Sequence, residues 1–381
     1  MREPPVQLDV ERFLSEYWQK SPCLIPAAFP GFAPDFDGDD LAGLACEPMA
    51  EARIISGAYP QNDWQVREGP FDHADFASLP EEHWTLLVQD VEKHYPPLVS
   101  LLEKFDFLPS WRLDDLMISY AAPGGSVGPH VDQYDVFLLQ AQGQRRWQIA
   151  EHFRPRFVEN CSLRVLAEFE PEQEWTLGPG DMLYLPPGIA HHGVALSAGM
   201  TWSIGLRAPC SADLLMAMGE QLAQSINPHY ADPGLELATR PGEIDQAALE
   251  RLRALMMQPL IDEEGFAQFA GTFLTRYRLA HEPAPPETRI DEPTLSKHLA
   301  AEGRVMRNPW TRIAWLRKEH GAVLFAAGNP FECSIHLAMA LGAQQVPEIP
   351  SAAQSGRDLS TLTELINAGH LIMVNKDPET P

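Results

Sequence analysis

The sequence has little of what marks membrane, secreted or nucleic-acid-binding proteins. It contains no run of about 18 apolar residues, so no membrane-spanning helix is expected, and the opening MREPPVQLDVERF lacks the apolar core of a secretory signal. Positive charge is scarce, because 28 Lys and Arg stand against 53 Asp and Glu, which gives a net charge of −25. Such a surface repels nucleic acid and anionic lipid and attracts basic partners. We therefore expect no membrane binding and no direct nucleic-acid binding.

Cysteine is also scarce, and its spacing argues against two further kinds of site. The five cysteines are odd in number, lie far apart and never form a CxxC pair, so neither a disulfide framework nor a thiolate zinc site is expected. A cytoplasmic location fits best. What is present is globular in character, with 45% apolar and 21% charged residues, and 381 residues suggest two or three domains.

The pattern of apolar and turn residues divides the chain into regions. Residues 9–20 are typical of an amphipathic helix capped by Asp9, with Leu14 among its apolar residues. Three segments that follow are typical of short strands: SPCLIP, ARIISG and DWQVREG. Residues 111–207 alternate short strands with Gly/Pro turns, which indicates a sandwich or barrel. Residues 211–280 carry Leu, Met and Ala at helical spacing and predict an all-helical segment. After a Pro-rich linker, the last part mixes helices with two or three short strands.

Two segments carry residues suited to hold a metal. His130 and Asp132 are separated by one residue, so on a strand both side chains project from the same face. The string GPGDMLYLPPGIAHH ends in His191 and His192 after a tight turn. Two histidines and one carboxylate on one side of a metal leave its other positions open, as non-haem iron(II) oxygenases require. A lone His-x-Asp pair is a weak signal, but the second string is specific, and together they predict a metal site.

These segments resemble the JmjC branch of the cupins, whose pattern is HxD followed by PGDxLYxPPGxxH. The similarity extends to WRLDDLMISY, GGSVGPHVDQYDVFLLQAQGQRRWQI and SIGLRAP, which resemble the bacterial ribosomal oxygenases. Those enzymes hydroxylate an arginine in the sixteenth protein of the large ribosomal subunit. The resemblance implies an α+β fold: a double-stranded β-helix (a cupin jelly-roll barrel) with a helical N-terminal part at 1–210, a helical dimerisation domain at 211–282 and a winged-helix-like domain at 283–381.

The resemblance also implies the reaction centre. His130, Asp132 and His191 correspond to the iron(II) ligands of a hydroxylase that uses 2-oxoglutarate and O₂ as cosubstrates. The PPGxxH spacing selects His191 as the ligand, with the side chain of His192 pointing away. The GGSVG segment lacks the strand–helix setting of a dinucleotide loop and is expected to let the backbone approach the metal site or to turn the chain sharply into His130.

A cation is needed for the distal carboxylate of 2-oxoglutarate, and arginine binds carboxylates through a planar fork. Arg145 and Arg146 follow the QGQ turn, and alternation along a strand places only one of them inside the barrel. The family match selects Arg145. Ser119 and Ser203 are candidate hydroxyl partners for the cosubstrate, although core serines are common.

Acidic and aromatic residues are expected near the mouth of the barrel, where a basic substrate side chain would need stacking and carboxylates. The candidates are Asp114, Asp115, Tyr134 and Asp135. The alternative is that these are solvated loop acids and a packing tyrosine. The implied partners are a basic ribosomal protein as substrate and a second copy of the chain in a homodimer, against the alternative that the apolar helices form a monomer's own core.

Other functions remain open at this point. A JmjC hydroxylase of another protein residue, such as histidine, would have the same metal motif, and a non-catalytic cupin would bind metal for structure. In the last part of the chain, a basic cluster in an otherwise acidic protein is interpreted as a solvated or internally paired surface, with nucleic-acid binding by a winged-helix-like domain as the alternative. Its members are Arg304, Arg307, Arg312, Arg317 and Lys318.

Overall fold

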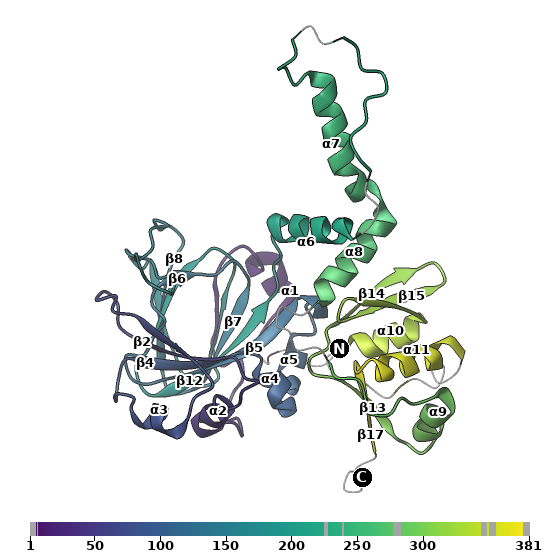
Figure 1. The fold of residues 1–381 in the computed structure, drawn as a ribbon. Helices are drawn as coiled ribbons and strands as arrows, with labels where there is room; N and C mark the ends of the chain where they lie inside the picture. The colour runs from purple at the N-terminus through teal and green to yellow at the C-terminus, as the bar shows by residue number, and fades with distance from the viewer. Residues whose placement is uncertain are drawn as a thin grey trace. The chain divides into compact units, whose positions relative to one another are not determined.

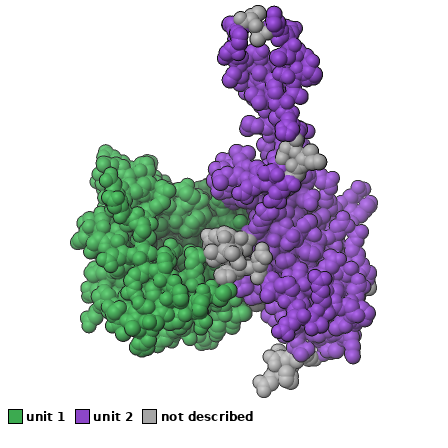
Figure 2. Space-filling view, in the orientation of Figure 1, with its two compact units in different colours: residues 1–208 green, residues 209–381 purple. Residues whose placement is uncertain are grey.

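The structure is a computed structural model that describes residues 5, 7–224, 228–237, 240–276, 283–343, 349 and 356–375. The chain divides into two compact units, residues 1–208 and 209–381 (Figure 2). The first unit contains a barrel of antiparallel strands, and the second contains helices and a smaller set of strands (Figure 1). None of the described helices is both long enough and apolar enough to cross a membrane.

The first unit is built on two sheets. The larger has the strand order β1-β10-β7-β12-β5-β4-β2-β3 and the smaller has the order β6-β11-β8-β9. All strand pairs in both sheets are antiparallel, which confirms the predicted barrel. The strands are β1 (Cys23–Ile25), β2 (Ala52–Ser56), β3 (Gln65–Glu68), β4 (Trp84–Val88), β5 (Leu113–Ala121), β6 (His130–Val131), β7 (Val136–Gln142), β8 (Arg145–Ala150), β9 (Gln173–Leu177), β10 (Met182–Leu185), β11 (Ala190–Ala195) and β12 (Gly199–Leu206).

The larger sheet is buried on both faces in its centre. In β7, Val136 and Leu138 face the smaller sheet and pack with Trp147 of β8. The alternate residue Phe137 faces the other way, into a core that the N-terminal segments complete. All eight residues of β12 are buried. Strands covered on both faces read as continuous apolar runs rather than as alternating patterns, and each large side chain buried this way stabilises the fold by about 1.5–3 kcal/mol.

The N-terminal helix covers the outer face of this sheet. Asp9 caps it by accepting from the backbone N–H of Arg12 at 3.1 Å, as predicted. After α1 (Val10–Arg12) the helix continues as a π-helical turn, η1 (Phe13–Tyr17). Phe13 is 1% exposed and its ring lies 4.8 Å from that of Tyr184, whereas Leu14 is 37% exposed. The prediction that Leu14 belongs to the apolar face is therefore wrong, because a π turn shifts the register of the following residues.

The remaining helical elements of the first unit are short and surround the larger sheet. They are α2 (Gly38–Leu44), α3 (His73–Ala77), α4 (Val91–His94), α5 (Val99–Leu102) and the 3₁₀ turns η2 (Pro96–Leu98), η3 (Glu103–Phe105) and η4 (Ser110–Arg112).

The second unit begins with three helices, α6 (Ser211–Ala223), α7 (Gln246–Ile261) and α8 (Glu263–Thr275). The prediction that residues 211–280 are all helical is wrong in one part, because residues 228–237 and 240–245 contain neither helix nor strand. The cause is local: this stretch contains three prolines and two glycines, which end helices. The last residues of the predicted segment, 277–280, lie outside the described part of the chain.

The C-terminal part of this unit has five strands rather than two or three. β13 (Arg304–Arg307) pairs with β17 (Leu371–Val374), and β14 (Ile313–Lys318), β15 (Gly321–Ala326) and β16 (Asn329–Cys333) form a second sheet. Its helices are α9 (Glu292–Ala300), α10 (Ile335–Gly342) and α11 (Gly356–Asn367). Leu324, Leu337 and Leu362 are fully buried at the centre of one core cluster, so this part has a hydrophobic core of its own.

Candidate metal centre

The predicted metal ligands meet on two adjacent strands of the smaller sheet. β6 and β11 pair so that His130 lies directly opposite His191. Side chains opposite each other on an antiparallel pair share a face, and the two imidazole rings lie 4.2 Å apart. Asp132 follows His130 by two residues. The candidate ligand atoms of the three residues all lie within 4.8 Å of one another, and no other set of His, Cys, Asp or Glu among the described residues has this geometry.

Backbone carbonyls fix the orientation of both imidazoles. Nδ1 of His130 lies 2.9 Å from the carbonyl of Gly128, and Nδ1 of His191 lies 3.0 Å from that of Ile189. A carbonyl only accepts, so each Nδ1 carries a proton, and Nε2 is the ring atom left to bind a metal. The two Nε2 atoms lie 3.8 and 3.6 Å from Oδ2 of Asp132. Burial, with His130 nearby, lowers the pKa of His191 to about 4, so its ring is neutral at pH 7.

The glycines before His130 let the chain reach this position. Gly128 has a positive φ of 79°, and a Cβ at this residue would lie 2.9 Å from the side chains of Trp64 and Val165. Gly124 also has a positive φ, of 73°. The expected sharp turn into His130 is present, and its last glycine places the carbonyl that orients the His130 ring.

The neighbouring histidine lies on the other face of β11. The ring of His192 packs edge-on against Tyr59 at 5.6 Å and against Phe169 at 6.0 Å, and it is not part of the metal cluster. Burial lowers the pKa of His192 to about 4, and within the described residues its Nε2 has no hydrogen-bond partner. His192 therefore behaves as a neutral, packed ring.

Alternation along β8 separates the two candidate arginines. Arg145 is 5% exposed, and its guanidinium lies over the ring of Trp147 at 5.0 Å. Its Nη2 donates to the carbonyl of Gly193 at 3.2 Å, whereas its Nε has no partner among the described residues. Arg146 is half-exposed, and its Nε lies 3.9 Å from a carboxylate oxygen of Glu174. Burial lowers the pKa of Arg145 to about 10, because the charge has lost its water.

The inner face of the barrel thus carries a row that leads from the metal cluster to a buried cation. The ring of Trp147 lies 5.9 Å from that of His191, and Arg145 lies on the far side of Trp147. Gly193 faces this row, since a Cβ there would lie 2.6 Å from the ring of Trp147 and 2.7 Å from Nε of Arg145. No sequence motif singles out Trp147 or Gly193, although each lies two residues from a predicted site residue.

The two candidate serines face the same interior from the larger sheet. Ser203 of β12 lies opposite Leu138 of β7, whose side chain packs against the smaller sheet. Ser119 of β5 lies opposite Thr201, two residues from Ser203 on the same face. Both serines are 6% exposed, and Oγ of Ser119 donates to the carbonyl of Thr201 at 3.3 Å.

The candidate substrate residues lie in different environments. Asp115 is 8% exposed and lies opposite Gly205 of β12. On its other side, Gly205 lies opposite Val136. Val136 is the first residue of β7 and follows the connection from Asp132. Asp115 therefore lies at the metal end of the barrel. Asp114 is half-buried beside it in the chain, where the register of β5 shifts against β12. Tyr134 is 42% exposed.

The interpretation of Asp135 as a mouth residue is wrong. Asp135 is fully buried and accepts hydrogen bonds from Tyr184, Gln19 and Arg112. A buried carboxylate that is already paired with an arginine in this way is not available to a substrate side chain.

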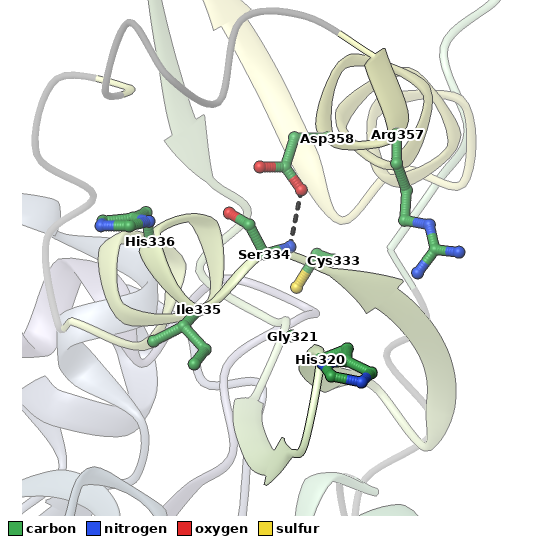
Figure 3. A pocket seen from close by; sticks show the side chains of 8 residues that line it. All are labelled: His320, Gly321, Cys333, Ser334, Ile335, His336, Arg357 and Asp358. Atoms are coloured by element: carbon green, nitrogen blue, oxygen red, sulfur yellow. Dashed lines mark hydrogen bonds between the residues drawn. The ribbon is translucent and has the colours of Figure 1, made fainter.

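A separate hollow of about 450 Å³ lies in the second unit (Figure 3). Two of its polar groups already have partners: the Asp358 carboxylate accepts from the backbone N–H of Ser334 at 2.7 Å, and Arg357 lies 3.0 Å from Glu332. Burial raises the pKa of the Cys333 thiol to about 12, so it is not a nucleophile.

The predicted basic cluster of the second unit is partly paired in the same way. Lys318 lies 2.7 Å from a carboxylate oxygen of Glu264, and the guanidinium of Arg317 lies 5.7 Å from the centre of the Trp315 ring.

The chemistry of the donor set in the barrel fits the groups inferred from the sequence. Two imidazoles and one carboxylate on one side of a point suit iron(II) and leave its other side open. The buried, incompletely hydrogen-bonded Arg145 suits a carboxylate that enters the same interior.

Comparisons with known proteins give matches over nearly the whole chain. A family model described as the JmjC domain matches residues 100–214, and one described as the ROXA-like winged helix matches residues 254–372. The ribosomal protein uL16 3-hydroxylase of Escherichia coli (strain K12) is 38% identical over 280 residues, which cover 72% of this chain and 74% of that protein. An X-ray structure of E. coli ycfD matches with a TM-score of 0.89 at 32% identity, over 98% of this chain and 100% of that one. The E. coli ribosomal oxygenase YcfD in complex with cobalt and 2-oxoglutarate matches with a TM-score of 0.83 at 33% identity, over 98% of this chain and 99% of that one.

Proposed function

This chain belongs to the JmjC-type ribosomal oxygenases, and from that premise we propose that it is an iron(II)- and 2-oxoglutarate-dependent protein hydroxylase. We propose that its substrate is the ribosomal protein uL16 and that its product carries a 3-hydroxyarginine. The observation that carries the proposal is the cluster of His130, Asp132 and His191, which shares the inner face of the smaller sheet with the buried Arg145.

Each inner residue has a role in this reaction. His130, Asp132 and His191 hold iron(II) from one side, and Arg145 pairs with the distal carboxylate of 2-oxoglutarate. When bound, iron(II) couples the oxidative decarboxylation of 2-oxoglutarate by O₂, which yields succinate and CO₂, to insertion of one oxygen atom into a C–H bond. The chain itself positions these groups and excludes water, since the interior is otherwise lined by buried apolar side chains. The hydroxyl groups of Ser119 and Ser203 add polar contacts for the cosubstrate.

The charge of the chain supports a basic substrate. With a net charge of −25, the protein attracts a basic ribosomal protein over long distances. Asp115 at the metal end of the barrel and the exposed Tyr134, with Asp114 beside them, are the proposed contacts to the substrate arginine, through charge-assisted hydrogen bonds and stacking. We place this reaction in the cytoplasm, which agrees with five cysteines that are all free.

Mass spectrometry of ribosomal proteins tests the proposal. Purified full-length protein is incubated with iron(II), 2-oxoglutarate, air and ribosomal proteins from cells that lack the enzyme, and fragment spectra locate any added oxygen. We expect one oxygen on one arginine of uL16, with one succinate formed per hydroxylation. A His130→Ala variant is the control, because it removes a ligand without touching the candidate substrate contacts.

The alternative outcomes separate the competing functions. An oxygen on a histidine of another ribosomal protein would keep the chemistry and contradict the proposed substrate. If wild-type protein binds iron but neither oxidises any protein nor consumes 2-oxoglutarate, the proposal is wrong and a non-catalytic metal-binding cupin is the better description.

We also propose that the helical segment, residues 211–282, forms a homodimer interface. Helix α7 has 16 residues and none of them is buried. Its apolar side chains are exposed instead, which a solvated monomer would not maintain over such an area. These residues are Leu249 (48%), Leu252 (43%), Met256 (75%), Met257 (42%) and Ile261 (71%).

Light scattering after size exclusion tests the dimer. We expect a mass twice the 42.4 kDa of one chain and a shift to one chain mass in a Met256→Lys variant. Met339→Lys is the matched control, because Met339 is a 58%-exposed methionine on another helix, α10. A wild-type mass of 42.4 kDa at micromolar concentration would contradict the proposal.

A further inference from the structure

The buried residue Asp135 joins four parts of the first unit, three through its carboxylate and one through its backbone carbonyl. Its Oδ1 accepts from the hydroxyl of Tyr184 on β10 at 2.5 Å. Its Oδ2 accepts from Nε2 of Gln19 after the N-terminal helix at 2.9 Å and from Nη2 of Arg112 before β5 at 2.8 Å. The backbone carbonyl of Asp135 accepts from the N–H of Leu206 at the end of β12 at 3.0 Å. Five residues distant in sequence are thus held at one point.

This point lies three residues from the metal ligand Asp132. The strand that precedes the ligand, β6, has only two residues, and β7 begins directly after Asp135. Between them, Gln133 and Tyr134 are exposed and belong to no strand or helix. At the other end, the carbonyl of Asp132 accepts from the N–H of Gly188 at 2.8 Å. The conformation of this short connection is therefore set by its two anchored ends.

We propose that Asp135 is a positioning residue for the metal centre, which fixes the connection so that the carboxylate of Asp132 faces His130 and His191 before any metal arrives. The inference rests on the proposed function in one respect, since it requires that these three residues bind a metal. A ligand held in place beforehand avoids the entropy cost of ordering it on binding. Loss of the anchor therefore weakens metal affinity, even when the fold persists.

The partners of Asp135 are themselves held firmly. The guanidinium of Arg112 lies over the ring of Trp18 at 5.3 Å and over that of Trp111 at 5.7 Å. Burial, together with the hydrogen bond to Asp135, raises the pKa of Tyr184 far above its ordinary value, so its hydroxyl remains a donor at every working pH. Because these partners are held in place, they cannot move to adapt to a changed side chain at position 135. In an Asp135→Asn variant, the N–H groups of the new amide would therefore face groups that also donate hydrogen bonds.

A purely structural role is the alternative, and a second buried carboxylate serves as its control. Asp90 is 2% exposed and is ion-paired with Lys93, which is also buried. The pair lies where β4 leads into α4, outside the metal cluster. Asp90→Asn and Asp135→Asn therefore remove the same charge from comparable depth, but only the second is linked to Asp132.

A cobalt(II) titration of metal-stripped, full-length protein tests the inference. Binding is followed by visible absorption, at a temperature well below the unfolding midpoint of each variant. We expect both variants to unfold at lower temperature in EDTA. Only Asp135→Asn should bind cobalt(II) more weakly, on the order of 10-fold or more. Tyr184→Phe, which keeps the ring and removes one donor to Asp135, should weaken binding by a smaller factor, and it decides the matter if Asp135→Asn does not fold.

Cobalt(II) affinities of Asp135→Asn and Tyr184→Phe equal to that of the wild type would overturn the inference and leave the proposed function intact. Equal weakening in Asp90→Asn would also overturn it, because the effect would then follow from lost stability alone. If wild-type protein gives no cobalt(II) spectrum that His130→Ala abolishes, the proposed function itself fails.

Discussion

Replacing Arg145 by methionine should stabilise the protein and impair it as an enzyme. Burial lowers the pKa of Arg145 to about 10, which corresponds to a cost of about 3 kcal/mol for holding the charge inside the barrel. Methionine removes this cost, but it loses the contact with the Trp147 ring, worth about 1 kcal/mol, and the hydrogen bond from Nη2 to the carbonyl of Gly193, worth about 1.5 kcal/mol for a charged donor. The net gain of about 0.5 kcal/mol corresponds to a rise of roughly 1–2 °C in the unfolding midpoint of a unit of this size. At pH values above about 10 the gain shrinks, because there the native protein no longer carries the charge.

The same substitution removes the proposed partner of 2-oxoglutarate. Two charge-assisted hydrogen bonds to a carboxylate contribute at least about 3 kcal/mol, so the KM for 2-oxoglutarate should rise roughly 100-fold. Calorimetry in EDTA without cosubstrate measures the first effect, and succinate formation at varied 2-oxoglutarate measures the second. Arg146→Met is the matched control, since Arg146 is half-exposed on the opposite face of β8.

The KM for 2-oxoglutarate and the unfolding midpoint each have an outcome that would contradict the role assigned to Arg145. An Arg145→Met variant whose KM for 2-oxoglutarate stays within about twofold of the wild type would show that the charge serves another purpose. An unfolding midpoint that falls would show that the buried charge is compensated by the fold after all.

Two further predictions concern the residues around this row. Gly193→Ala should lower the free energy of unfolding by about 1–3 kcal/mol and raise the KM for 2-oxoglutarate, because the new Cβ would lie 2.6 Å from the ring of Trp147 and 2.7 Å from Nε of Arg145. Gly219→Ala in α6, where a Cβ meets nothing within 4 Å, is its control, and unchanged kinetics in Gly193→Ala would contradict the assigned geometry. Burial lowers the pKa of His192 to about 4, whereas an unfolded histidine titrates near 6.5, so the unfolded chain takes up the proton first. His192 should therefore account for a loss of up to about 3 kcal/mol in the stability of the metal-free protein as the pH falls from about 6.5 to 4. Denaturant unfolding at several pH values in EDTA checks this, and a His192→Gln variant with the same pH dependence as the wild type would rule out His192 as the cause.

The clustering of the metal ligands could be predicted because its signal is local. His130 and Asp132 share a face by strand alternation, and His191 follows a turn set by prolines and glycines. The choice between Arg145 and Arg146 needed the family resemblance, since alternation alone leaves both phases open. Barrel strands were visible in the same way, as short apolar runs between turn residues.

What the sequence did not reveal depends on residues far apart in the chain. Asp135 was interpreted as a mouth residue, but its partners Gln19, Arg112 and Tyr184 lie 116, 23 and 49 positions away, and no local pattern brings them together. The need for glycine at position 193 likewise follows from its strand neighbour Trp147. In the second unit, the helical spacing of apolar residues predicts helix throughout 211–280, although prolines and glycines in the middle of this segment end the helices.

The eight-stranded sheet is continuous across the start of the JmjC match, and this limits which part of the chain can fold and bind a metal by itself. The JmjC match begins at residue 100, yet β2, β3 and β4 extend the same hydrogen-bonded ladder from β5, and β1 adds to its other edge. A fragment that started at residue 100 would leave an unpaired edge on β5 and would expose the core around Phe137. Both changes would make the fragment prone to aggregate. The smallest piece that evolution or an engineer can transplant is therefore the whole first unit. Removal of the segment before residue 100 should therefore also destabilise the strands that carry the metal ligands.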